Sequence, residues 1–113
     1  MNEPRPLDRT SAAEYASWFR ALGDATRVQI LNLLALERRP MRVGEIVDAV
    51  EVGQSTVSQH LKVLTTVGFV LVEHRGTASL YHVNERCVSC FPSAADLVMG
   101  ALPAPAKAPW RAA

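Results

Sequence analysis

The sequence predicts a mainly α-helical domain that ends in a β-hairpin, and two observations support this prediction. From about Ser11 to Gly68, apolar residues recur at the spacing that places them on one face of a helix. After Gly68 the pattern changes to the alternation that is typical of strands. The chain has 113 residues, which is enough for one domain with a modest core and gives no reason to expect two.

The composition is that of a soluble globular protein, since 49% of the residues are apolar and 20% are charged. No apolar run is long enough to span a membrane, and the first residues lack the apolar core of a signal peptide. We therefore expect a cytoplasmic protein. The formal net charge is only +1, so any attraction for nucleic acid must be local.

The first helix is predicted to follow a disordered start, residues 1–10, which is rich in proline and charge. Ser11 and Glu14 have the spacing of a capping box. An apolar helical face follows, formed by Tyr15, Trp18, Phe19 and Leu22. Large aromatic side chains on a short helix must be covered, and the sequence leaves open whether a partner subunit or the protein's own core covers them.

Two more helices are predicted before the segment that starts at Gln54. Asp24 can cap a helix that runs to Glu37, is apolar nearly all round and is expected to be the central buried helix. A shorter helix runs from about Val43 to Val50. The turn after it, residues 51–53, has the length and glycine content found between the two helices of a helix-turn-helix.

The helix predicted from Gln54 to Gly68 has the composition of a helix that reads DNA. Its apolar stripe lies opposite a surface of amides, hydroxyls and one lysine, and no acidic residue occurs from Gln54 to Phe69. Glutamine can pair with an adenine edge, and serine or threonine can bond phosphates or bases. The alternative is an ordinary amphipathic surface helix. The residues expected to contact DNA from this helix and the hairpin after it are Gln54, Ser55, Thr56, Ser58, Gln59, His60, Lys62 and Arg75.

The remainder of the chain predicts a wing and a last helix. Residues 69–74 and 78–83 are strand-like and flank a turn, so they predict a β-hairpin, which after a DNA-reading helix makes a winged helix-turn-helix. A final helix is predicted after Asn84, which can cap it, with an interruption at Pro92. Residues 103–113 are rich in proline and alanine and are expected to be an unstructured tail, so the domain spans residues 11–102.

Three stretches resemble the ArsR/SmtB family of bacterial repressors. Phe19–Leu31 is similar to the entry into that family's helix-turn-helix, Ser55–Leu64 to its recognition helix, and Gly68–Val70 with Arg75–Gly76 to its wing. The resemblance implies a winged-helix homodimer that binds operator DNA and releases it when an inducer binds.

Pairing of two such subunits through their first and last helices would place the recognition helices about one duplex turn, roughly 34 Å, apart. The residues then expected at the dimer interface are Tyr15, Trp18, Phe19 and Leu97.

The family's metal sites transfer only in part. The stretch that matches its third-helix Cys-Val-Cys cluster is Arg42–Ile46, which has no thiol. The last helix has Glu85 and Asp96 but no histidine for a zinc or nickel site. Its Cys87 and Cys90 look like the cysteines of a subset of arsenic or mercury sensors.

Two thiols restrict the ion that they can bind. Residues three apart on a helix share a face, so both sulfurs can converge on one soft ion. Structural zinc needs four donors, whereas Hg(II) can be held linearly by two and methylarsenite has two open positions. Inorganic As(III) would need a third ligand, for which His82 is the best candidate, although His82 can equally be a plain strand-surface residue. A thiol redox switch, or buried cysteines in a regulator with a non-metal inducer or none, are the alternatives.

The sequence does not predict an enzyme. It has no Ser/His/Asp grouping and no phosphate-cradling glycine loop, and the CxxC of thiol oxidoreductases normally occurs in a βαβ setting that this pattern lacks. We therefore predict a metal(loid)-responsive transcriptional repressor. A winged helix that binds protein instead of DNA is the remaining alternative.

Overall fold

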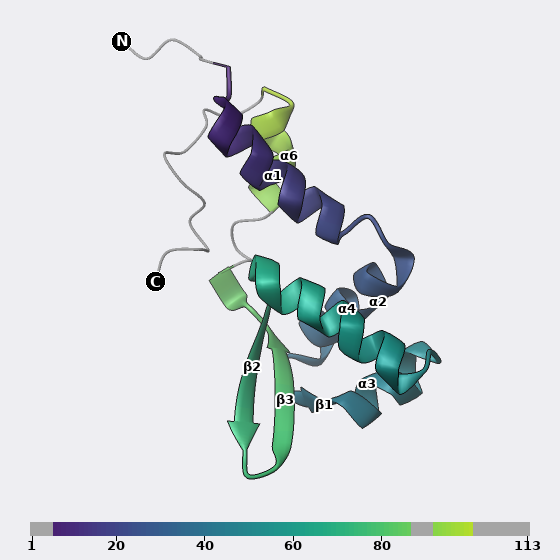
Figure 1. Cartoon of the computed structure of the whole chain (residues 1–113). Coiled ribbons are helices and arrows are strands. Elements are labelled where there is room, and N and C mark those ends of the chain that lie inside the picture. Colours follow the sequence, from purple (N-terminus) through teal and green to yellow (C-terminus); the bar gives the residue numbers. More distant parts are fainter. Residues whose placement is uncertain (1–5, 87–91, 101–113) are drawn as a thin grey trace.

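The computed structural model describes residues 6–86 and 92–100, and it confirms a mainly α-helical winged helix-turn-helix (Figure 1). The expected tail, residues 103–113, lies outside the described residues. The elements in chain order are α1 (Arg9–Ala21), α2 (Ala25–Glu37), β1 (Met41–Arg42), α3 (Val43–Val50), α4 (Gln54–Val67), β2 (Val70–Arg75), β3 (Ala78–Val83) and α6 (Pro92–Val98).

Helix α1 begins earlier than the sequence predicted because Asp8 caps it. The Oδ1 atom of Asp8 accepts the backbone N–H of Ser11 at 2.7 Å. The prediction of a disordered start is therefore wrong for Arg9 and Thr10, which form the first turn. The predicted capping box at Ser11 is also wrong, since Ser11 lies inside the helix.

Asp24 caps α2 as predicted, and its Oδ1 atom accepts the backbone N–H of Thr26 at 2.9 Å and of Arg27 at 3.1 Å. The prediction that α2 is the central buried helix is wrong. Ile30 and Leu34 are fully buried, whereas Leu36 is 72% exposed. A chain of this size has too few elements to cover every face of a central helix.

The core forms around α4, which packs against α1, α2, α3 and β2. Burial of a leucine or valine side chain stabilises the fold by about 1.5–3 kcal/mol relative to exposure. The largest fully buried side chains are Trp18, Phe69, Ile30, Leu34, Ile46, Leu61 and Leu64. Because four elements contact α4, its inner face and therefore its outer face are fixed.

The three strands form an antiparallel sheet in the order β1-β3-β2. Strand β1 was not predicted, and it exists through the pairing of Met41 with Tyr81 and of Arg42 with Leu80. Strands β2 and β3 form the predicted hairpin, which projects away from the helices in Figure 1. Gly76 in its turn has a φ of +60°, a left-handed conformation that glycine adopts without a Cβ penalty.

Asn84 joins the end of the wing to the end of α4. Its Nδ2 group donates to the carbonyl oxygen of Gly68 at 2.8 Å, and its Oδ1 atom accepts the backbone N–H of Arg86 at 3.1 Å. The second bond confirms the predicted cap at Asn84. The side chain is buried, so these bonds also satisfy a polar group inside the protein.

Candidate nucleic-acid interface

Helix α4 is held so that one face must meet solvent. It begins after Gly53 and ends at Gly68, whose φ of +94° is the left-handed conformation that closes a last turn. Val57, Leu61 and Leu64 occupy the inner face and are fully buried. The outer face is therefore set by the helical repeat.

The outer face brings together six of the residues predicted to contact DNA. All six are exposed: Gln54, Ser55, Thr56, Ser58, Gln59 and Lys62. No carboxylate occurs in α4, and its first turn has no side-chain cap. The N–H groups of that turn can therefore bond an oxyanion, and the helix dipole adds partial positive charge there.

The hydroxyl groups near the other end of α4 are used within the helix. The Oγ1 atoms of Thr65 and Thr66 donate to the carbonyl oxygen of Lys62 at 3.0 and 2.8 Å. Apart from Lys62, the polar groups free to meet a ligand therefore gather in the first half of α4.

Arg75 lies on a different element, at the end of β2 in the wing. Its side chain is 70% exposed, and its Nη2 atom lies 3.4 Å from Oε1 of Glu73. The neighbouring His74 contacts Ser79 through Nδ1 and Oγ at 3.1 Å. An exposed ion pair of this kind is worth little, so Arg75 can exchange Glu73 for a phosphate.

His60 is the one predicted DNA contact of α4 whose side chain is turned inward. Only 16% of its side chain is exposed. Its Nδ1 atom lies 3.2 Å from Nη1 of Arg27, and its Nε2 atom lies 3.8 Å from Oδ1 of Asp24, both at the start of α2. The pKa of Asp24 is lowered, first by the backbone N–H of Arg27 and further by the backbone N–H of Thr26 and by the Arg27 charge.

Sequence reasoning missed Arg27. It is the one basic residue in α2, and it is partly buried. A cation at that position in a largely apolar helix needs acceptors nearby, which is a signal that the sequence did carry.

The residues predicted at a dimer interface divide into two groups. Tyr15 and Trp18 are buried in the chain's own core, 5% and 0% exposed, with their ring centroids 4.7 Å apart. Neither can therefore offer much surface to a partner. Phe19 is 38% exposed on α1, and Leu97 on α6 is half-buried.

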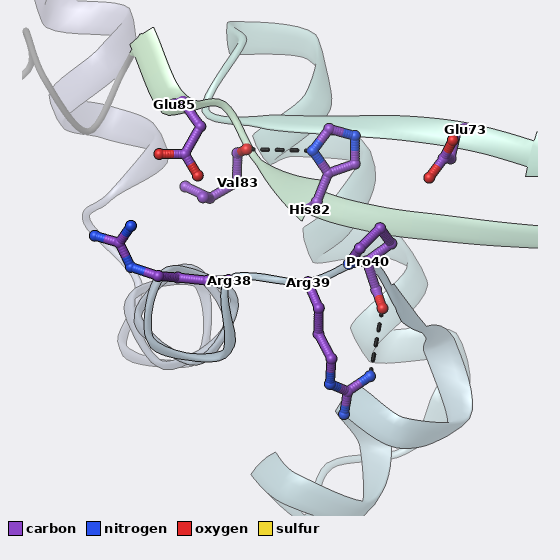
Figure 2. Close-up of a pocket in the computed structure, with 7 residues that line it drawn as sticks. All are labelled: Arg38, Arg39, Pro40, Glu73, His82, Val83 and Glu85. Carbon is purple, nitrogen blue, oxygen red and sulfur yellow. Dashed lines mark hydrogen bonds between the residues drawn. The ribbon is translucent and has the colours of Figure 1, made fainter.

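His82 lines an open hollow of about 300 Å³ between the α2–β1 connection and the wing, with Glu73 and Glu85 among its neighbours (Figure 2). Its Nδ1 atom lies 3.3 Å from the carbonyl oxygen of Val83. Because a carbonyl only accepts, this contact places the proton on Nδ1 and leaves the lone pair on Nε2.

Within the described residues there is no group of three or more His, Cys, Asp or Glu side chains that could hold a metal ion. Cys87 and Cys90, the predicted ligands, lie outside the described residues.

Comparison with known proteins identifies the fold's family. Residues 24–71, from the cap of α2 through α4 into β2, match the model described as bacterial regulatory protein, arsR family. The chain is 34% identical over 76 residues to the arsenical resistance operon repressor of Bacillus subtilis, a match that covers 67% of this chain and 71% of that protein. The chain belongs to the ArsR family.

Two further proteins are similar to this ArsR-family chain. The chain is 41% identical over 68 residues to the uncharacterised HTH-type transcriptional regulator MJ1325 of Methanocaldococcus jannaschii, which covers 60% of this chain and 75% of that protein. The solution structure of the homodimeric winged helix-turn-helix DNA-binding domain Mb0332 from Mycobacterium bovis superposes with a TM-score of 0.63 and 29% identity, covering 83% of this chain and 91% of that one.

Like its relatives, this ArsR-family chain is a transcriptional regulator and not an enzyme. None of the helices in residues 6–86 and 92–100 is long and apolar enough to cross a membrane.

Proposed function

We propose that this chain is a repressor that binds operator DNA as a homodimer and reads it with α4. The observation that supports the proposal is the exposed face of α4, where amides, hydroxyls and one lysine stand without a carboxylate. Such a face can enter the major groove without repelling the phosphates that line it.

The chemistry of each exposed group suggests its role. Gln54 and Gln59 present amides that match an adenine edge, and Ser58 lies between them on the same face. Ser55 and Thr56, together with the N–H groups of the first turn, are placed to hold a phosphate. Lys62 and, from the wing, Arg75 add charge toward the DNA backbone. With so few cations per subunit, the salt dependence of binding is expected to be modest for a DNA-binding protein.

A second copy is expected to pair along α1 and α6. Phe19 on α1 is 38% exposed, Val98 at the end of α6 is 47% exposed, and Met99 directly after α6 is 80% exposed, so apolar surface is available there. The relative from Mycobacterium bovis is described as a homodimer. Pairing of this kind would set two copies of α4 about one duplex turn, roughly 34 Å, apart.

The inducer in this proposal is a thiophilic metal(loid) held by Cys87 and Cys90, either Hg(II), methylarsenite or As(III). The two thiols select soft ions, and the relative from Bacillus subtilis is an arsenical resistance operon repressor. If a third ligand is used, His82 has its Nε2 lone pair available. Both cysteines lie within the five residues that precede α6 in the sequence, so an ion that joins them would shift the paired helices and misalign the two reading helices.

The inducer must bind the DNA-free form more tightly than the DNA-bound form, by a coupling of about 1–3 kcal/mol. The test is a titration of the purified protein, bound to the DNA upstream of its own gene, with Hg(II), methylarsenite, arsenite, Cd(II) and Zn(II). We expect release with the ions that two thiols can hold, and reversal by excess dithiol. Release by an oxidant alone, with no response to any ion, would replace metal sensing with a redox switch.

A further inference from the structure

One guanidinium group joins three helices of the domain. Arg27, in the first turn of α2, donates from Nε to the carbonyl oxygen of Ala21 at 2.5 Å and from Nη2 to that of Arg20 at 3.4 Å. Both carbonyls lie at the end of α1, where the helix dipole is negative. Its remaining nitrogen, Nη1, lies 3.2 Å from Nδ1 of His60 on α4.

This contact determines the protonation of His60. A guanidinium group can only donate, so Nδ1 must accept, and the imidazole is neutral with its proton on Nε2. That proton faces Oδ1 of Asp24, 3.8 Å from Nε2. Asp24 is itself fixed by the backbone N–H groups of Thr26 and Arg27. We call Asp24, Arg27 and His60 the corner triad.

We propose that Arg27 and Asp24 are positioning residues, which hold α4 in its DNA-binding orientation through the neutral imidazole of His60. The proposal rests on the DNA-binding function proposed above. The corner triad lies at the junction of α1, α2 and α4, and its His60 directly follows Ser58 and Gln59 of the reading face in sequence. Since α1 also carries the exposed Phe19, the triad links the expected subunit seam to the reading helix.

The proposal assigns His60 a pH dependence opposite to that of a phosphate contact. Among the described residues, the charged groups that contact the imidazole are Arg27 and Asp24 from α2. The nearby end of α1 presents carbonyl oxygens, and no charged side chain described in α3 or β2 pairs with it. Protonation at Nδ1 would remove the acceptor and place a cation against the guanidinium. DNA binding should then weaken as histidine becomes charged, whereas a direct phosphate contact would strengthen.

The first experiment needs no DNA. Nitrogen-15 NMR of the imidazole at pH 7.5 reports which nitrogen carries the proton. We expect a bare Nδ1 in the wild-type protein and a loss of this preference in Arg27→Gln and Arg27→Lys. A proton on Nδ1 in the wild-type protein would overturn the proposal.

The second experiment measures the dissociation constant for operator DNA at pH 8 and pH 5.5. We expect wild-type affinity to weaken about tenfold at the lower pH, as for the loss of one charge-assisted hydrogen bond. The affinity of His60→Gln should differ little between the two pH values. Arg27→Lys keeps the positive charge but not the several N–H donors of the guanidinium group. It should therefore bind operator DNA weakly at both pH values, while its circular dichroism spectrum stays native. Affinity that rises at pH 5.5, or an unchanged pH response in His60→Gln, would show that His60 does not act through the triad.

These two readouts separate the triad from the proposed function. If the wild-type protein bound no DNA at either pH, the repressor proposal would fail. The tautomer of His60, and its loss in the Arg27 variants, would still decide whether the triad exists.

Discussion

Replacement of Gln59 with alanine tests the reading face while leaving the fold intact. Gln59 is exposed on α4, and its side chain forms no hydrogen bond with another described residue. Alanine is a better helix former than glutamine, so thermal stability should stay the same or rise slightly. Any loss of DNA binding therefore comes from the missing amide.

The size of the loss follows from the proposed dimer. A bidentate amide–adenine pair discriminates by about 1–3 kcal/mol, which is about 5- to 150-fold in the dissociation constant for each copy. A homodimer presents Gln59 twice, so the affinity of the variant for the operator should fall by more than the contribution of one such pair. A scrambled duplex offers no matched adenine and should lose little.

Fluorescence anisotropy with operator and scrambled duplexes, at one fixed salt concentration, measures both losses. Gln29→Ala is the matched control, since Gln29 is an exposed glutamine on a different helix, α2. Equal losses on the two duplexes would refute base reading by Gln59 and reduce it to a backbone contact.

Three further predictions concern the inducer, the end of α4 and the cap of α2. Cys87→Ser and Cys90→Ser should each bind operator normally in a gel shift but resist release by Hg(II) or methylarsenite; continued release would exclude that thiol as a ligand. Gly68→Ala should cost about 1–2 kcal/mol in urea unfolding, because the φ of +94° is costly for a residue with a Cβ; an unchanged midpoint would contradict this. Asp24 has a pKa lowered mainly by the backbone N–H of Arg27. Its contribution to stability is therefore present above its unfolded-state pKa of about 4 and is lost as the pH falls through its folded-state pKa. The melting temperature of the wild-type protein should therefore fall more steeply below about pH 4 than that of Asp24→Asn. Parallel curves of melting temperature against pH would show that the protonation of Asp24 is not coupled to folding.

The sequence predicted the elements whose patterns are local. The change from helical to alternating periodicity located the wing, and Asp24 and Asn84 were identified as caps because capping depends on a few neighbouring residues. The exposed face of α4 followed in the same way, because burial of Val57, Leu61 and Leu64 fixes what lies opposite.

The features that the sequence did not predict depend on contacts between residues far apart in the chain. Strand β1 has two residues and exists only through its partners in β3, about forty positions away. The contact between Arg27 and His60 joins residues 33 positions apart and follows from how α2 crosses α4. Periodicity showed that Trp18 must be covered but not by what, and the structure covers it with the protein's own core.

DNA binding by the first half of α4 is the part of the proposal on which the rest depends. Amide chemical-shift mapping by NMR, as operator duplex is added to the full chain, tests it most directly. We expect the largest shifts on Gln54, Ser55, Ser58 and Gln59, with a smaller set around Arg75 in the wing. Shifts confined to another surface, with these amides unchanged at saturating DNA, would contradict it.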